Sequence, residues 1–256
     1  MRLDERFAGI DARPAAVRYG LPVTRRLPDA VLTIVVVELA LVVVGLIRTP
    51  SALTAGHGVL SLAGVVVAQA ACAVAARWGP VSVRRVPAAA IKVGIVVGTV
   101  TGALYGAEIV GEYVTPALTR ASVAAGYVIV TAIVASACVA GAVGAQRGGS
   151  WRAGLVSAVW NAIAEYLVWY PGVLVSYYAF SGTAAGHRVV YAEGTLDDFH
   201  RSGMTDFPAF VLQDFFGAGL FHLLAGLVIA ALFGSAAAAL ARAVRPAVPS
   251  ALTPPG

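Results

Sequence analysis

Residues 30–47 read AVLTIVVVELALVVVGLI, with Val, Leu or Ile at thirteen of eighteen positions and a single acid, Glu38, at the centre. A helix needs about 20 predominantly apolar residues to cross the hydrocarbon core of a bilayer. This stretch therefore predicts a transmembrane helix close to the lower limit of length.

Five further apolar segments follow along the chain. With the first, the expected spans are Ala30–Ile47, Val59–Ala76, Ala88–Ala107, Ser122–Ala145, Ala153–Phe180 and Phe207–Ala241. Only 12% of all residues are charged, against about 25% in ordinary soluble domains. The sequence predicts an all-α integral membrane protein, a bundle of six transmembrane helices. The last segment would measure about 50 Å against a core of about 30 Å, so it must tilt, break or begin outside the bilayer.

The basic residues are distributed asymmetrically between the gaps that separate these segments. Fourteen of the eighteen Lys and Arg residues lie before the first segment, after the last one, or beside the gaps that follow the second and fourth segments. Lys and Arg are enriched in cytoplasmic loops. We therefore expect cytoplasmic tails at 1–29 and 243–256 on either side of a transmembrane domain at 30–242, located in the cell membrane.

The net charge of +5 does not indicate a nucleic-acid partner, because the cations are spread out and no aromatic residues are interleaved with them. The expected partner is the lipid bilayer and its anionic headgroups.

Small residues repeat along the third segment. Gly94, Gly98, Gly102 and Gly106 follow one another at intervals of four, so they share one helix face. Such a row lets a second helix approach closely. We favour packing within one subunit. A homo-oligomer interface, a contact with partner membrane subunits and a glycine-lined pore are the alternatives.

A layer of polar residues is expected at mid-membrane depth. Glu38 and Gln69 lie near the centres of the first two segments, Asn161 and Glu165 share a face of the fifth, and His222 lies inside the sixth. A central acid costs about +2.5 to +3.5 kcal/mol on insertion, whereas each Val, Leu or Ile contributes about −0.3 to −0.6. Insertion therefore tolerates Glu38, and we expect it to face inward.

Ionisable residues within the membrane are candidates for a functional site. We take Glu38, Gln69, Asn161, Glu165 and His222 as candidate substrate- or ion-binding residues, together with Asp214, two helical turns before His222. The alternative is an interhelical hydrogen-bond network that fixes packing. Pro171-Gly172, less than two turns after Glu165, predicts a kinked or broken helix.

The segment at 181–206 is expected to form an exterior, lid-like loop. Thr195 and Asp198 resemble a capping box, which predicts a short helix over about 196–201 followed by Gly203. Thr205 or Asp206 is expected to cap the next helix, with Pro208 in its first turn.

Motifs for catalysis, cofactors or metals are weak. The chain has no G-x-S-x-G sequence, no phosphate-binding glycine loop and no closely spaced histidine pair. No catalytic residue and no cofactor is therefore expected, and whether histidines and acids bind a metal stays open.

Three hypotheses about function remain. The first is a small transporter or transport-complex subunit that moves a cation or small solute through the polar layer. The second is a structural or assembly subunit of a larger membrane complex, and the third is a metal-dependent membrane enzyme. In architecture alone, without a residue motif, the layout resembles the substrate-binding membrane components of vitamin uptake systems, and no site residue is carried over.

Overall fold

The computed structural model describes residues 23–82, 86–114, 120–192 and 194–244, and every regular element in these ranges is helical. The elements are α1 (Val23–Arg48), a 3-10 turn η1 (Pro50–Leu53), α2 (Gly58–Ser82), α3 (Ala88–Val114), α4 (Arg120–Gly148), α5 (Trp151–Phe180), α6 (Ala184–Ala192), α7 (Thr195–Ser202), α8 (Phe207–Ile229), a π turn η2 (Ala230–Gly234) and α9 (Ser235–Ala243).

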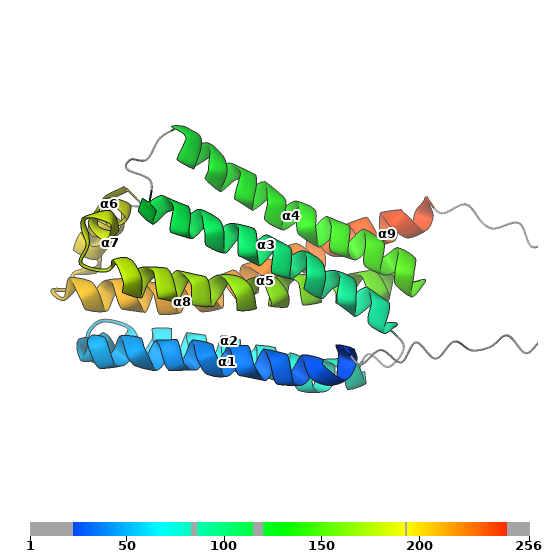
Figure 1. The fold of residues 1–256 in the computed structure, drawn as a ribbon, viewed down its shortest axis with the longest axis horizontal. Helices are drawn as coiled ribbons and strands as arrows, with labels where there is room; N and C mark the ends of the chain where they lie inside the picture. Colours follow the sequence, from blue (N-terminus) through cyan, green and yellow to red (C-terminus); the bar gives the residue numbers. More distant parts are fainter. Residues whose placement is uncertain (1–22, 83–85, 115–119, 193, 245–256) are drawn as a thin grey trace, which may run out of the picture.

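The long helices run up and down one bundle (Figure 1). Five of the stretches expected to span lie in helices that are long and apolar enough to cross a membrane: Arg26–Arg48, Gly58–Trp78, Ala88–Val114, Ala124–Gly148 and Phe207–Ala243. The remaining expected span, Ala153–Phe180, forms α5, which is not among the helices long and apolar enough to cross a membrane.

Helix α5 lies at the centre of the bundle. It packs on α1, α3, α4, α8 and α9, and most of its side chains are buried. Because its surroundings are largely protein, it carries Asn161, Glu165 and several Trp and Tyr residues that lower its apolarity. The helix continues through Pro171-Gly172 without interruption, so of the two predicted outcomes, a kink or a break, the break is not formed.

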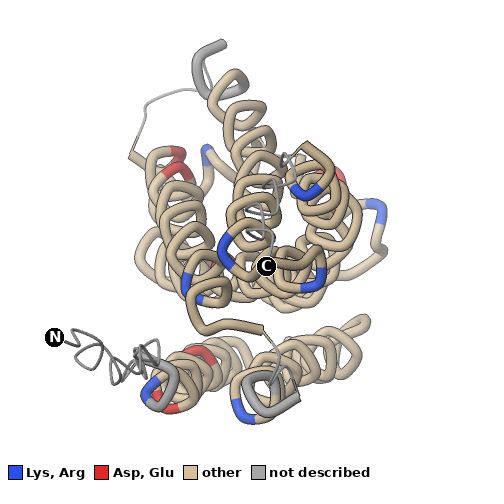
Figure 2. Tube along the Cα trace, turned by 90° about the vertical axis from the view of Figure 1, so that its right-hand side faces the viewer, with Lys and Arg blue, Asp and Glu red and all other residues tan. Residues whose placement is uncertain are grey.

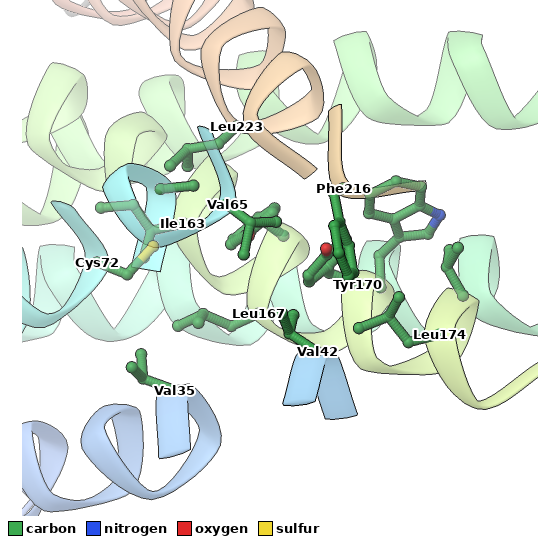
Figure 3. Close-up of a cluster of buried hydrophobic side chains, with 14 of the residues drawn as sticks. Val35, Val42, Val65, Cys72, Ile163, Leu167, Tyr170, Leu174, Phe216 and Leu223 are labelled. Carbon is green, nitrogen blue, oxygen red and sulfur yellow. The ribbon is translucent and has the colours of Figure 1, made fainter. Parts of the chain in front are cut away.

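The helices α1 and α2 form a hairpin that covers one side of α5 and α8 (Figure 1). The largest hydrophobic core lies at this junction (Figure 3). There Val35 and Val42 of α1 and Val65 of α2 belong to the same buried cluster as Tyr170 of α5 and Phe216 of α8. This contact joins the hairpin to the rest of the bundle.

The last expected span is one continuous helical run, α8–η2–α9, of 37 residues. Its N-cap is Asp206, whose carboxylate accepts a hydrogen bond from the Ala209 N–H at 3.0 Å, and Pro208 lies in its first turn. The prediction of this cap is therefore confirmed for Asp206. The run crosses the bundle obliquely, since α8 packs on α2 whereas α9 packs on α4 (Figure 1).

Lys and Arg residues gather at one end of the bundle (Figure 2). We call it the basic end, defined by Arg26, Arg77, Lys92, Arg147, Arg152 and Arg242. The opposite end carries α6 and α7 (Figure 1), and we call it the lid end.

The lid end differs from expectation in two details. The helix α6 was not anticipated, since its nine residues are too few for a clear apolar pattern. The helix α7 begins at Thr195 itself and its N-cap is Gly194, at φ 76° without a side-chain cap, so the predicted capping box is wrong. Gly203 does end α7, at φ 71°, as expected.

Candidate functional site

The first polar cluster joins the α1–α2 hairpin to α5. Glu38 of α1 is completely buried, and Gln69 of α2 is 1% exposed. The Gln69 side-chain amide donates one hydrogen bond to Oε2 of Glu38 and a second, at 2.8 Å, to the hydroxyl of Tyr166 on α5. Three helices are therefore linked through one amide group.

This cluster retains unused hydrogen-bonding capacity. Among the described residues, Oε1 of Glu38, Oε1 of Gln69 and the hydroxyl of Tyr170 have no hydrogen-bond partner, although all three atoms are buried. Buried polar atoms without partners are uncommon in proteins. Sequence reasoning identified Glu38 and Gln69 but missed Tyr166 and Tyr170, which read as ordinary aromatic core residues.

Asn161 belongs to a different contact on α5. Its side-chain amide donates to the hydroxyl of Ser136 on α4 at 3.1 Å, and Ser136 donates to the Ile133 carbonyl at 2.8 Å. Both Asn161 and Ser136 are buried. Asn161 therefore joins α5 to α4, whereas Tyr166 joins α5 to the hairpin.

Glu165 lies one turn after Asn161 on the same face of α5. Its side chain is 7% exposed, and no described residue donates a hydrogen bond to its carboxylate. The α5 backbone at this position lies against α3, where a Cβ on Gly102 would come within 2.5 Å of the Glu165 carbonyl oxygen. Glu165 is thus enclosed without a polar partner in the described part of the chain.

His222 of α8 belongs to an aromatic stack. Its ring stacks on Trp169 of α5 with centroids 3.8 Å apart, and Trp169 stacks on Tyr105 of α3 at 5.2 Å. The Tyr105 hydroxyl lies 3.1 Å from Nε2 of His222. Neither Trp169 nor Tyr105 was expected to contact His222, because the contact depends on how three separate helices are rotated.

The hydrogen bonds of the expected polar layer are therefore divided among separate groups of residues. Glu38 and Gln69 meet each other, whereas Asn161 and His222 each have partners on other helices. Asp214 lies elsewhere, exposed at the lid end of α8.

The glycine row of α3 lies against the backbone of α5. A Cβ on Gly94 or Gly98 would come within 2.0 or 2.1 Å of the carbonyl oxygens of Ser157 and Asn161. Gly106, the last of the row, has nothing within 4 Å. Three of the four glycines thus permit a close helix pair inside one chain.

A cavity of about 390 Å³ opens beneath α6 and α7 at the lid end. We call it the lid cavity. It is lined by Arg48, Thr49, Tyr113, Tyr177, Ser181, Gly182, Gly186, His187, Val189, Val190, Thr195, Phe207, Pro208, Val211, Asp214 and Phe215. Of these residues, sequence reasoning had selected only Asp214, because the others come from six helices and their connections.

Two charged side chains of opposite sign line this cavity. Arg48, at the end of α1, donates to the Tyr178 carbonyl at 3.4 Å, and its guanidinium lies 5.5 Å from the centre of the Tyr178 ring. Within the described ranges the one ion pair joins Arg201 to Asp198 on α7. Neither Arg48 nor Asp214 is therefore neutralised by an ion pair with a described residue.

Metal-ligating groups do not come together in the described part of the chain. No group of three or more His, Cys, Asp or Glu side chains there has a geometry that could hold an ion.

Comparison with known proteins assigns no family: no protein-family model, no curated protein and no solved structure matches the chain.

Proposed function

We propose that the protein is a subunit of a membrane transport system that captures a small solute in the lid cavity. The observation that carries this proposal is a cavity of about 390 Å³ that combines Arg48 and Asp214 with aromatic and aliphatic side chains. Ligand sites are typically concave, mostly apolar and equipped with a few orienting polar groups.

The lining supports a particular class of solute. Arg48 offers a planar array of donors to a carboxylate, and Asp214 offers acceptors to an ammonium group. Tyr177, Val211 and Phe215 provide apolar surface beside them. We therefore propose a small zwitterion with an apolar body, such as an amino acid with an apolar side chain.

The lid helices support capture from the aqueous side. The helix α6 packs on α3 and α5, and α7 packs on α6 and α8. At Gly186 a Cβ would come within 2.3 Å of the Phe180 carbonyl oxygen. The lid is therefore held close to the end of α5, over the cavity.

A binding experiment tests the solute class. The full chain in lipid nanodiscs is titrated with phenylalanine, 3-phenylpropionate and phenethylamine, which share one ring and differ in charge. We expect the zwitterion to bind most tightly, and we expect Arg48→Gln and Asp214→Asn each to weaken it at least tenfold. Arg201→Gln on α7, outside the lining, serves as the matched control. Absence of binding by all three probes would contradict the proposal.

The proposed topology has six spans, with the basic end in the cytoplasm and the lid end outside. Alternation of helix direction and the cations at the basic end support it. Thr183→Cys and Gly149→Cys, at the two ends of α5, are introduced separately after Cys72→Ala and Cys138→Ala. In intact cells a membrane-impermeant maleimide should label position 183 but not position 149. Equal labelling of both positions would mean that α5 does not cross.

The second candidate function is an assembly subunit of a larger membrane complex. It is favoured by one observation, the division of the polar layer into separate pairings rather than one path. Under this alternative the phenyl probes do not bind, and the chain purifies from its native membrane in mild detergent with a fixed set of other membrane proteins.

A further inference from the structure

The Glu38 cluster holds the middle of the α1–α2 hairpin against α5, whereas other hydrogen bonds hold its lid end. Toward the lid end, the Tyr178 hydroxyl donates to the Leu41 carbonyl, less than one turn from Glu38, at 2.7 Å, and Gln213 donates to the Ala52 carbonyl in the hairpin turn at 3.0 Å. At mid-hairpin the amide of Gln69 connects Glu38 to Tyr166. The orientation of the Gln69 amide therefore affects how the middle of the hairpin is attached to α5.

The hydrogen bonds of Gln69 are incompatible with a proton on the Glu38 oxygen that it faces. Both hydrogens of the amide are used, one toward Glu38 and one toward Tyr166. An ionised Glu38 accepts the first of them. If Oε2 of Glu38 carried a proton, two donors would face each other.

A rotation of the amide by half a turn resolves this conflict. Amide oxygen and nitrogen are nearly equal in size, so the two orientations occupy the same space. After rotation, Oε1 of Gln69, which has no partner among the described residues, accepts hydrogen bonds from protonated Glu38 and from the Tyr166 hydroxyl. With the proton on Oε2, the rotated amide therefore accepts two hydrogen bonds, as many as the unrotated amide donates when Glu38 is ionised.

The surroundings of Glu38 favour uptake of a proton. The helix α1 packs on α2, α5 and η1. Among the described residues, the titratable groups that interact with the Glu38 charge are Cys72 of α2 and Tyr166 and Tyr170 of α5, and η1 contains none. No described Lys, Arg or His forms an ion pair with Glu38. An ionised carboxylate buried without a cation is costly, and a proton removes that cost.

We propose that Glu38 is an exchangeable proton-binding site in the interior of the bundle, read out by the orientation of the Gln69 side-chain amide. The proton binds to a carboxylate oxygen of Glu38, no covalent bond other than O–H forms or breaks, and the amide turns to accept that hydrogen. None of the residues of this site lines the lid cavity, so the site stands independently of solute capture.

Infrared difference spectroscopy tests the proposal. The full chain in lipid nanodiscs is compared at acidic and alkaline pH, within the range in which it stays folded. We expect the carbonyl band of a protonated carboxylic acid to grow on acidification, and we expect Glu38→Gln to abolish that change. Glu165→Gln, at a second buried acid, is the matched control and should keep the Glu38 band.

Tyr166→Phe is a second test variant, and it leaves the Glu38 side chain unchanged. It removes only the hydroxyl that bonds to Gln69, so the band should persist and shift in frequency. The proposal is overturned if the pH-dependent band survives in Glu38→Gln, if it is lost in Glu165→Gln alone, or if Tyr166→Phe leaves its frequency unchanged. A Glu38 band of constant height at all pH values overturns proton exchange as well.

Discussion

Gly98 and Asn161 face each other across the α3–α5 contact so closely that a Cβ on Gly98 would lie 2.1 Å from the Asn161 carbonyl oxygen. The obstacle is backbone in the middle of a long helix, which cannot rotate away as a side chain can. The separation of α3 and α5 therefore depends on the absence of a side chain at position 98.

Gly98→Ala is expected to destabilise the protein, by about 1–3 kcal/mol, because the added methyl group overpacks the contact. The measurement is the apparent melting temperature in a mild detergent. Gly106→Ala is the matched control, because nothing lies within 4 Å of its Cβ position and alanine favours a helix over glycine. Equal melting temperatures of the two variants would show that the α3–α5 contact accommodates a methyl group at position 98.

Gln213 holds the turn between α1 and α2. Its amide donates to the carbonyl oxygens of Ala52 and Ala55, at 3.0 and 2.6 Å, and its oxygen accepts from the His57 N–H at 3.2 Å. Gln213→Leu should leave the Ala52 carbonyl and the His57 N–H without partners, at about 1–3 kcal/mol for each group that stays buried. The Ala55 carbonyl still accepts from the Gly58 N–H at 3.2 Å.

Hydrogen exchange is the appropriate measurement, because the loss is local. We expect faster exchange of the backbone amides between residues 49 and 58 in Gln213→Leu. Gln146→Leu, at an exposed glutamine of α4, should leave that segment unchanged. Unaltered exchange in Gln213→Leu would mean that the turn is held by its apolar contacts alone.

His222 contributes both a ring stack with Trp169 and a hydrogen bond with Tyr105. His222→Phe keeps a ring for the stack and removes the bond, whereas His222→Ala removes both. We expect stability to fall in the order wild type, His222→Phe, His222→Ala, with about 1 kcal/mol for the bond and about 0.5–1.5 kcal/mol for the aromatic pair.

Thermal denaturation followed by tryptophan fluorescence measures this order, since Trp169 is itself part of the stack. Phe221→Ala, at the exposed neighbouring position, should have a smaller effect than His222→Ala. The reverse order of these two variants would place the stabilising contact outside the stack.

The cap of α8 should respond to pH. The hydroxyl of Ser51 and the N–H of Ala209 stabilise the carboxylate of Asp206 and hold its pKa below its usual value. A pKa lowered by folding means that the contribution to stability is complete above the unfolded-state pKa and is lost as the pH falls through the folded-state pKa.

We therefore expect the apparent melting temperature to fall in acid, with a smaller fall in Asp206→Asn, because asparagine caps a helix without titrating. Asp206→Ala should be less stable than wild type at neutral pH, by about 0.5–2 kcal/mol. A pH profile identical in wild type and Asp206→Asn would assign the acid sensitivity to other groups.

Much of the helical layout follows from local sequence. Preferences that act within a few residues explain the apolar run 30–47, the Asp206 cap with Pro208, and Gly203 after α7. The cations of the basic end likewise follow from where apolar runs stop. Glu38 could be predicted to face inward, because a lipid-facing acid would forfeit much of the insertion energy of its helix.

The pairing of the polar groups was decided only by the tertiary structure. Hydropathy and periodicity place Glu38, Asn161 and His222 at similar depth, but they do not determine the rotation of each helix about its axis or which neighbour it meets. That rotation is set by packing between helices distant in sequence, as where Gly98 admits the backbone of Asn161. The sequence therefore predicted which polar side chains lie near the middle of the helices. Their separate hydrogen-bond partners and the lid cavity arise from contacts between residues far apart in the chain.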